Sequence, residues 1–400
     1  MWGYEEALRI YRTVEDWQGK PDARYRGKGG PVWCQPANDP HPVAPAMLEA
    51  CRSLGLPVLE DQNGAREEGA GGFAYMNQII KQGQRQSMAR SYLYPVLARK
   101  NVTLLVKAHV DRLTFSGTRV TGVQMRRGEA VSTVSAKSEV IVSAGGINTP
   151  KLLMLSGIGA EAELRKHGIK TRVNAPEVGR NFQDHLLHGG CLWEPKEGLP
   201  HRNSAAEVAG FVKSQSGLAS PDLNLVQIEV PYASEVVAKD YAPPPTSWAL
   251  CAGLIAPKSR GTVTLRSGKL DDRPIVDAQF LSHPDDVKAL AIGIEMCRDI
   301  GNSAPMREFA KREVAPGKRL EGTAMEDFVR NGATTYFHES GTCRMGKDKQ
   351  AVVDAKLRVN GLQNLRIADS SIMPRIAGVA TMASCVLIGE RMASILAERT

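Results

Sequence analysis

The sequence predicts an α/β fold in which helices and strands are mixed, divided between a layered α/β part and a second, mixed part. An apolar run at residues 139–146 ends in small residues. This pattern is typical of a buried strand whose C-terminal end lies next to a ligand in a layered α/β domain. Strand-like runs at residues 223–230 and 261–267 lie among long proline-containing loops and precede a helical pattern at 284–301. From about residue 338 the sequence again resembles that of the layered part. The layered domain is therefore expected to be discontinuous.

The individual elements follow from local patterns along the chain. Apolar residues at helical spacing predict helices at residues 4–17 and 42–55, the second closed by Gly55, and a glycine- and proline-rich turn at 24–36 leads into a short strand. Residues 101–150 hold β-branched runs separated by turns and predict three or four antiparallel strands. A short helix with Pro150 near its start follows at 149–159, and the last helix spans 383–398.

Composition and charge exclude several classes of protein. Of 400 residues, 42% are hydrophobic and 24% charged, which fits a soluble globular protein. The net charge of +8 is interspersed rather than gathered in a patch, so no nucleic-acid partner is expected. No run is long enough for a membrane span, and the first residues include acids where a signal peptide has Lys or Arg. The seven scattered cysteines are then expected to be reduced thiols in the cytoplasm.

Three motifs invite a functional interpretation that their context does not support. Residues 69–74 and 157–162 approach the G-x-G-x-x-G phosphate loop, but such a loop follows a strand and opens a helix, and these follow a polar stretch and a helix-like run. Both are predicted to be turns. The pair His185 and His188 has the spacing of a metal site, but no third ligand is in sight, so surface or packing histidines are favoured. No metal site is predicted.

Several segments are similar to the glucose–methanol–choline (GMC) family of flavin-dependent oxidoreductases. "SAGGINTPKLLMLSGIG" resembles the second family signature, with Gly146 where alanine is usual, and "VGRNFQDHL" resembles the segment that follows it. "SRGTVTLRS" with "PIVDAQFLSHPDD" resembles the substrate domain, and "HESGTCRMG" with "IADSSIMPRI" the C-terminal active-site region. They occur in the family's order over essentially the whole chain.

The resemblance implies an FAD-binding Rossmann-like domain, incomplete in this sequence, together with an antiparallel-sheet substrate domain. It divides the chain into an N-terminal helical and loop part of the cap and FAD-lid region (1–90), part of the FAD-binding domain (91–180), the substrate domain (181–335) and the C-terminal FAD-binding part with the active-site loop (336–400). The family's N-terminal G-x-G-x-x-G strand–turn–helix has no counterpart here. The sequence is then a fragment, or another chain supplies that half-site, or FAD binding has been lost.

The resemblance implies that FAD accepts a hydride at N5 from the CH–OH group of an alcohol, with His338 as the base. A neutral imidazole suits this step because its ordinary pKa keeps it deprotonated near neutral pH. The alternative is a loop histidine bonded to the backbone. Met382 occupies the position of the family's second catalytic group, an Asn or His, and a thioether cannot donate or accept a proton.

Further residues match family positions that approach the cofactor. They are Val110 at the adenine, Ala144 and Gly145 on the adenosine side, Asp369 and Ser370 near the ribityl chain and pyrophosphate, and Ala383 beside the pyrimidine edge. For Asp369 the alternative is a helix or turn cap. The N-terminus of the last helix is expected to face the electron-rich edge of the flavin.

The expected partners are a small-molecule alcohol and an electron acceptor, either O2 or a quinone-like compound. Two alternative functions stay open. One is a truncated or flavin-free remnant or subunit without catalysis, and the other is a cyanohydrin lyase that uses the same histidine. The sequence does not identify the alcohol.

Overall fold

The computed structural model describes residues 2–64, 69, 71–198 and 202–398. Its largest sheet is antiparallel and has seven strands in the order β18-β12-β15-β14-β13-β3, with β19 also pairing with β12. The predicted strand at 223–230 is confirmed as β14. The strands are β3 (Gly72–Tyr75), β12 (Leu186–Glu194), β13 (Val208–Val212), β14 (Leu223–Ile228), β15 (Trp248–Leu254), β18 (Arg312–Ala315) and β19 (Ala333–Thr335).

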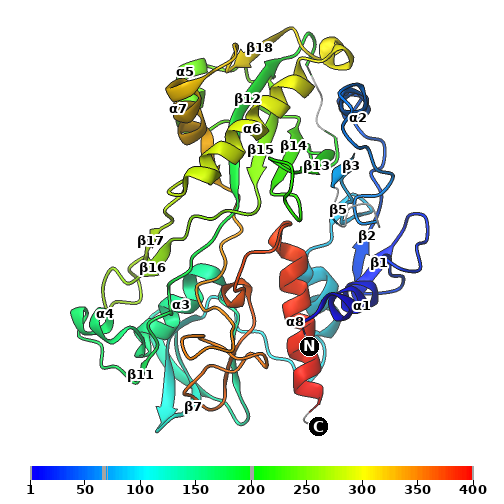
Figure 1. The fold of residues 1–400 in the computed structure, drawn as a ribbon. Helices are drawn as coiled ribbons and strands as arrows, with labels where there is room; N and C mark the ends of the chain where they lie inside the picture. Colours follow the sequence, from blue (N-terminus) through cyan, green and yellow to red (C-terminus); the bar gives the residue numbers. More distant parts are fainter. Residues whose placement is uncertain (1, 65–68, 70, 199–201, 399–400) are drawn as a thin grey trace.

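Helices cover one face of this sheet, shown in the upper half of Figure 1. The helix α6 runs from Pro284 to Gly301, as the sequence predicts, and packs along β12, β14 and β15. At its end a Cβ on Gly301 would lie 2.2 Å from the ring of Trp193, so only glycine allows this close approach. Trp193 in turn stacks on Trp248 with ring centroids 4.7 Å apart. The neighbouring helices are α2 (Val43–Ser53), α5 (Glu235–Tyr241) and α7 (Gly322–Gly332).

The predicted layered part of the chain forms a second hydrophobic core. Three antiparallel strands, β6 (His109–Ser116), β7 (Arg119–Arg127) and β8 (Ala130–Ser135), confirm the strands expected there. The apolar run forms β9 (Val140–Val142), which pairs in parallel with β20 (Leu365–Ile367). This pairing across more than two hundred residues confirms that the chain returns to the layered part. The strand is less buried than expected, since Ile141 is 39% exposed.

Two helices complete this region. The helix α3 (Gly145–Leu155) begins directly after β9, four residues earlier than predicted. The C-terminal helix α8 (Thr381–Ala397) stands beside α1 (Tyr4–Val14) in Figure 1, and Arg391 of α8 donates to Glu6 of α1 at 2.9 Å. The predicted first helix is confirmed over Tyr4–Val14, but its last three predicted residues form the strand β1 (Glu15–Trp17) instead. The predicted short strand is confirmed as β2 (Val32–Cys34), which pairs in parallel with β1.

The remaining elements are short. The glycine stretch at 157–162 forms a two-residue strand and opens the six-residue α4, so the predicted turn is wrong there, and the stretch at 69–74 leads into β3. No helix in the described part of the chain is long and apolar enough to cross a membrane. The short elements are β4 (Ile80–Lys81), β5 (Gln84–Arg85), η2 (Ala89–Leu93), η3 (Tyr94–Val96), β10 (Ile158–Gly159), α4 (Glu161–Lys166), β11 (Val173–Asn174), β16 (Thr262–Thr264), β17 (Ile275–Asp277), η4 (Ala304–Glu308) and η5 (Ser370–Ile372).

Candidate active site

His338 lies in the loop that leaves the large sheet after β19. Because β19 pairs with the first residues of β12, the loop runs beside the segment that precedes β12. The main-chain N–H of His338 donates to Asp184 Oδ1 at 2.8 Å, and the other oxygen of Asp184 accepts from Thr335 Oγ1 at 2.5 Å. Ser340 pairs with Gln183 through two main-chain hydrogen bonds. The loop is therefore fixed at its base by residues far away in the sequence.

The side chain of His338 meets a second histidine. Nδ1 of His338 lies 3.1 Å from Nδ1 of His185, and the two rings are perpendicular. His185 is fully buried, and the ring of Tyr336 covers His338 at 4.8 Å between centroids. The prediction that His185 and His188 are surface or packing residues holds for His188, which packs on Phe328 and bonds its carbonyl. His185 is likewise buried, and it packs edge-on against His338.

Burial sets the protonation states of this group. It lowers the pKa of His338 below the ordinary value of 6.5, and it lowers the pKa of His185 to about 4, with the neighbouring His338 adding to that effect. Burial also raises the pKa of the Asp184 carboxyl to about 6. Both imidazoles are therefore neutral at neutral pH, which is the state that a general base needs.

A brace of polar side chains joins the His338 loop to the turn before α8. Asn181 donates to the carbonyls of Gly341 and Pro374, and Gln183 donates to that of Pro374 and accepts from the N–H of Ile376. Asn181 adopts the left-handed backbone region with φ +56°, which asparagine tolerates better than most residues. The segment 178–186 thus positions both sides of the candidate site.

Four predicted cofactor residues lie together around η5. Asp369 accepts from the N–H of Gly145 at 2.9 Å and caps η5 through the N–H of Ser371. The alternative interpretation of Asp369, a helix or turn cap, therefore matches the contacts that it makes within the chain. Ser370 donates to the carbonyl of Glu339 in the His338 loop, and Ala144 precedes the first residue of α3. Val110 is more distant, on the strand β6 that packs against α3, and is 37% exposed.

Gly146 explains one departure from the family signature. A Cβ at this position would lie 2.5 Å from the carbonyl oxygen of Glu339, and Thr342 donates to the carbonyl of Gly146 at 2.6 Å. The His338 loop therefore lies directly on the first turn of α3, and an alanine would push against its backbone.

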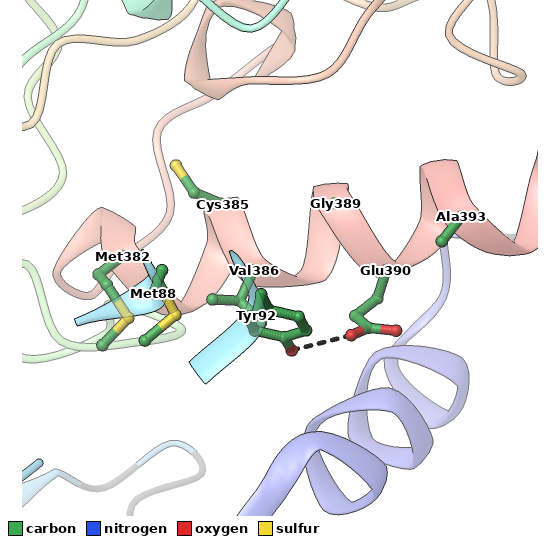
Figure 2. Close-up of a pocket in the computed structure, with 8 residues that line it drawn as sticks. All are labelled: Met88, Tyr92, Met382, Cys385, Val386, Gly389, Glu390 and Ala393. Carbon is green, nitrogen blue, oxygen red and sulfur yellow. Dashed lines mark hydrogen bonds between the residues drawn. The ribbon is translucent and has the colours of Figure 1, made fainter. Parts of the chain in front are cut away.

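The opposite side of the site is the N-terminal end of α8. No side chain caps this helix, and Val379 and Met382 are 44% and 43% exposed. Met382 lines a pocket of about 480 Å³ along α8, where Figure 2 shows it beside Met88. Further along α8, Tyr92 donates to Glu390 at 2.8 Å. Ala383 lies in the first turn of α8. Helix α8 also contacts η5, the element that begins with Ser370.

These features fit a flavin. The N-terminus of α8 carries no side-chain cap, and helix N-termini favour electron-rich groups. Gly145 has φ +82° and a Cβ there would meet nothing within 4 Å, so this backbone is open to a ligand. In the described part of the chain no cluster of His, Cys, Asp or Glu suits a metal ion.

Comparison with known proteins decides the family. Two family models, both described as GMC oxidoreductase, match residues 1–187 and 257–389. The chain belongs to the GMC oxidoreductase family. It is therefore an FAD-dependent oxidoreductase that acts on the CH–OH group of an alcohol.

Relatives and solved structures of this family share most of the chain. It is 33% identical to the oxygen-dependent choline dehydrogenase of Brucella anthropi, over 100% of this chain and 76% of that enzyme. It is 34% identical to an alcohol dehydrogenase [acceptor] of Pseudomonas putida, with the same coverage. The crystal structure of pyridoxine 4-oxidase from Mesorbium loti has a TM-score of 0.93 and 32% identity, over 99% of this chain and 78% of that one.

The sequence patterns missed His185, Asp184 and Tyr336. The first two directly precede β12, and Tyr336 directly follows β19, so all three sit at the ends of paired strands. The signal that could have found them is position, because polar residues at strand ends often line sites. Their proximity to His338 depends on the β12–β19 pairing, which the sequence did not reveal.

Proposed function

We propose that this GMC oxidoreductase uses His338 as the general base that takes the hydroxyl proton of its alcohol substrate. The observation that supports this role is the neutral, half-buried imidazole of His338, whose ring contacts His185 and whose main-chain N–H donates to Asp184. A hydroxyl within about 2.6–3.2 Å of the free ring nitrogen is in reach of proton transfer. FAD, when bound, accepts the hydride from the carbinol carbon.

We assign the cofactor contacts of this chain to both sides of η5. Ala144, Gly145, Asp369 and Ser370 would hold the flavin through main-chain groups, Ala383 would lie at its pyrimidine edge, and Val110 would approach the adenine. The open N-terminus of α8 supports this assignment because its N–H groups favour the electron-rich edge of the ring. Met382 occupies the second catalytic position but contributes no polar group, so the alkoxide-like transition state would depend on main-chain N–H groups or water there.

We propose O2 as the electron acceptor, because an oxygen-dependent choline dehydrogenase and a choline oxidase are among the relatives. A quinone-like acceptor is the alternative. Hydrogen peroxide formed in step with alcohol consumption would support O2, and turnover with a quinone analogue but not in air would contradict it. A cytoplasmic location is a further proposal, supported by the seven free thiols.

The purified chain should take up FAD and show flavin absorption that an alcohol bleaches under anaerobic conditions. Choline, pyridoxine and simple primary alcohols are the first compounds to test, since relatives carry the names of enzymes that act on such compounds. A coloured protein that no alcohol bleaches would contradict the activity. A protein that stays colourless with FAD would assign the flavin site to residues outside these 400, in a longer form of the chain or a separate one.

A further inference from the structure

The buried contact between His185 and His338 constrains where the proton of each ring lies. Two Nδ1 atoms 3.1 Å apart share one hydrogen, because a neutral imidazole has one N–H and one lone pair. Either His338 donates to His185, which leaves Nε2 of His338 with a free lone pair, or His185 donates to His338, which places the proton of His338 on Nε2. Only the first arrangement leaves His338 Nε2 able to accept a proton from a substrate.

The surroundings of His185 bear on the first arrangement in two ways. In that arrangement its own proton is on Nε2, which is buried and makes no well-formed hydrogen bond among the described residues. Main-chain groups of Ala377 and Ile255 nevertheless favour a protonated ring, as carbonyl oxygens do when they face an N–H.

The reaction itself favours the same arrangement. Once His338 has taken the substrate proton, both of its nitrogens carry hydrogen, and Nδ1–H needs an acceptor in a buried place. The lone pair of His185 Nδ1 supplies that acceptor. Burial keeps the pKa of His185 near 4, so the proton stays on His338 instead of passing inward. In the opposite arrangement two N–H groups would face each other.

We propose that His185 is a positioning residue: it accepts a hydrogen bond from Nδ1–H of His338 and thereby keeps Nε2 of His338 free as the base. This inference rests on the proposed role of His338. Asp184 accepts from the main-chain N–H of His338 and Tyr336 packs on its ring, so both hold His338 in the geometry that the hydrogen bond needs.

The direct test is the tautomer of His338 in the whole FAD-loaded chain labelled with 15N-histidine. Long-range 1H–15N spectra at pH 7.5 distinguish protonated from unprotonated ring nitrogens, and His338→Gln assigns the signals. The inference predicts a protonated Nδ1 and an unprotonated Nε2 on His338, and the reverse on His185. A proton on Nε2 of His338 would overturn the inference whether or not the enzyme is active.

Two substitutions of equal size sharpen the test. His185→Asn retains an acceptor oxygen near the position of Nδ1, whereas His185→Leu retains none. We expect the leucine variant to lose the tautomer preference and roughly tenfold in kcat, with KM almost unchanged, and the asparagine variant to recover most of the rate. Equal losses in both variants would mean that His185 only fills space.

His188→Leu is the matched control. His188 is also fully buried and lies three residues further along, on β12, but it bonds to the carbonyl of Phe328. This substitution should lower the stability of the fold and leave the tautomer and kcat of His338 unchanged. If it shifts them as much as His185→Leu does, the effect is one of packing. If His185→Leu does not fold, the spectra of the unsubstituted chain still decide.

Discussion

The His338 loop and the N-terminal end of α8 are both joined to η5, yet they are held in opposite ways. The loop is fixed by buried side chains, among them Asp184 and His185. The start of α8 has no side-chain cap and exposes Val379 and Met382. The difference teaches that this chain holds the proposed base, His338, in a fixed position. At the N-terminal end of α8 it offers only main-chain groups.

The largest expected effect comes from removing the imidazole. His338→Ala should lower kcat/KM by about 10²- to 10⁴-fold, the usual contribution of a positioned base, without altering flavin binding. Met382→Ala should change kcat/KM little, because a thioether offers no proton donor or acceptor. His109→Ala, at an exposed histidine on β6, is the control for loss of a histidine. If His338→Ala and Met382→Ala lose activity equally, the contrast between the His338 loop and the start of α8 is wrong.

A donor added to the open wall should give a smaller effect in the opposite direction. Met382→Asn places an amide N–H at the exposed start of α8, where it can stabilise the developing alkoxide. We expect kcat to rise by about tenfold, the value of one hydrogen bond to a charged group. Met382→Leu has similar size without the amide and should leave kcat unchanged. A decrease with asparagine would show that the methionine has a function of its own.

The smallest expected effect concerns the close contact beneath the His338 loop. Gly146→Ala forces a Cβ to within 2.5 Å of the Glu339 carbonyl and should destabilise the fold by roughly 1–3 kcal/mol. Gly389→Ala in α8 meets nothing within 4 Å and should stabilise the fold by up to about 1 kcal/mol. Urea unfolding of both variants measures the difference. Full stability of the Gly146 variant would mean that the loop can move away.

The same two regions show how far sequence patterns reach. Local signals were sufficient for α6, whose bounds match the prediction, and for the three strands β6, β7 and β8, because periodicity and turn residues act over short distances. The pairing of β9 with β20 was not predicted as such. The sequence indicated only a discontinuous layered domain, because the pattern after residue 338 resembles that of the earlier part. Helix α3 begins earlier than predicted because Gly145 can adopt a positive φ directly after the strand.

The candidate site was only half visible in the sequence. His338 stood out because it lies in a motif of small residues, and Met382 because a family position lacks its polar group. His185 appeared as one member of a metal-like pair, and its true neighbour is 153 residues away. Hydrogen bonds such as those of Asp184 and Gln183 depend on strand register, which one sequence does not specify.

The pH dependence of anaerobic flavin reduction by an alcohol tests the central claim most directly. If His338 is the base, its unprotonated form is required, so the rate should rise with pH and be half-maximal below 6.5, the ordinary histidine value. Asp184→Asn removes the one neighbouring carboxyl whose pKa, about 6, falls in the same range, and the acid limb should persist in it. A rate that is independent of pH between 5 and 8, or an acid limb that survives in His338→Ala, would contradict the account.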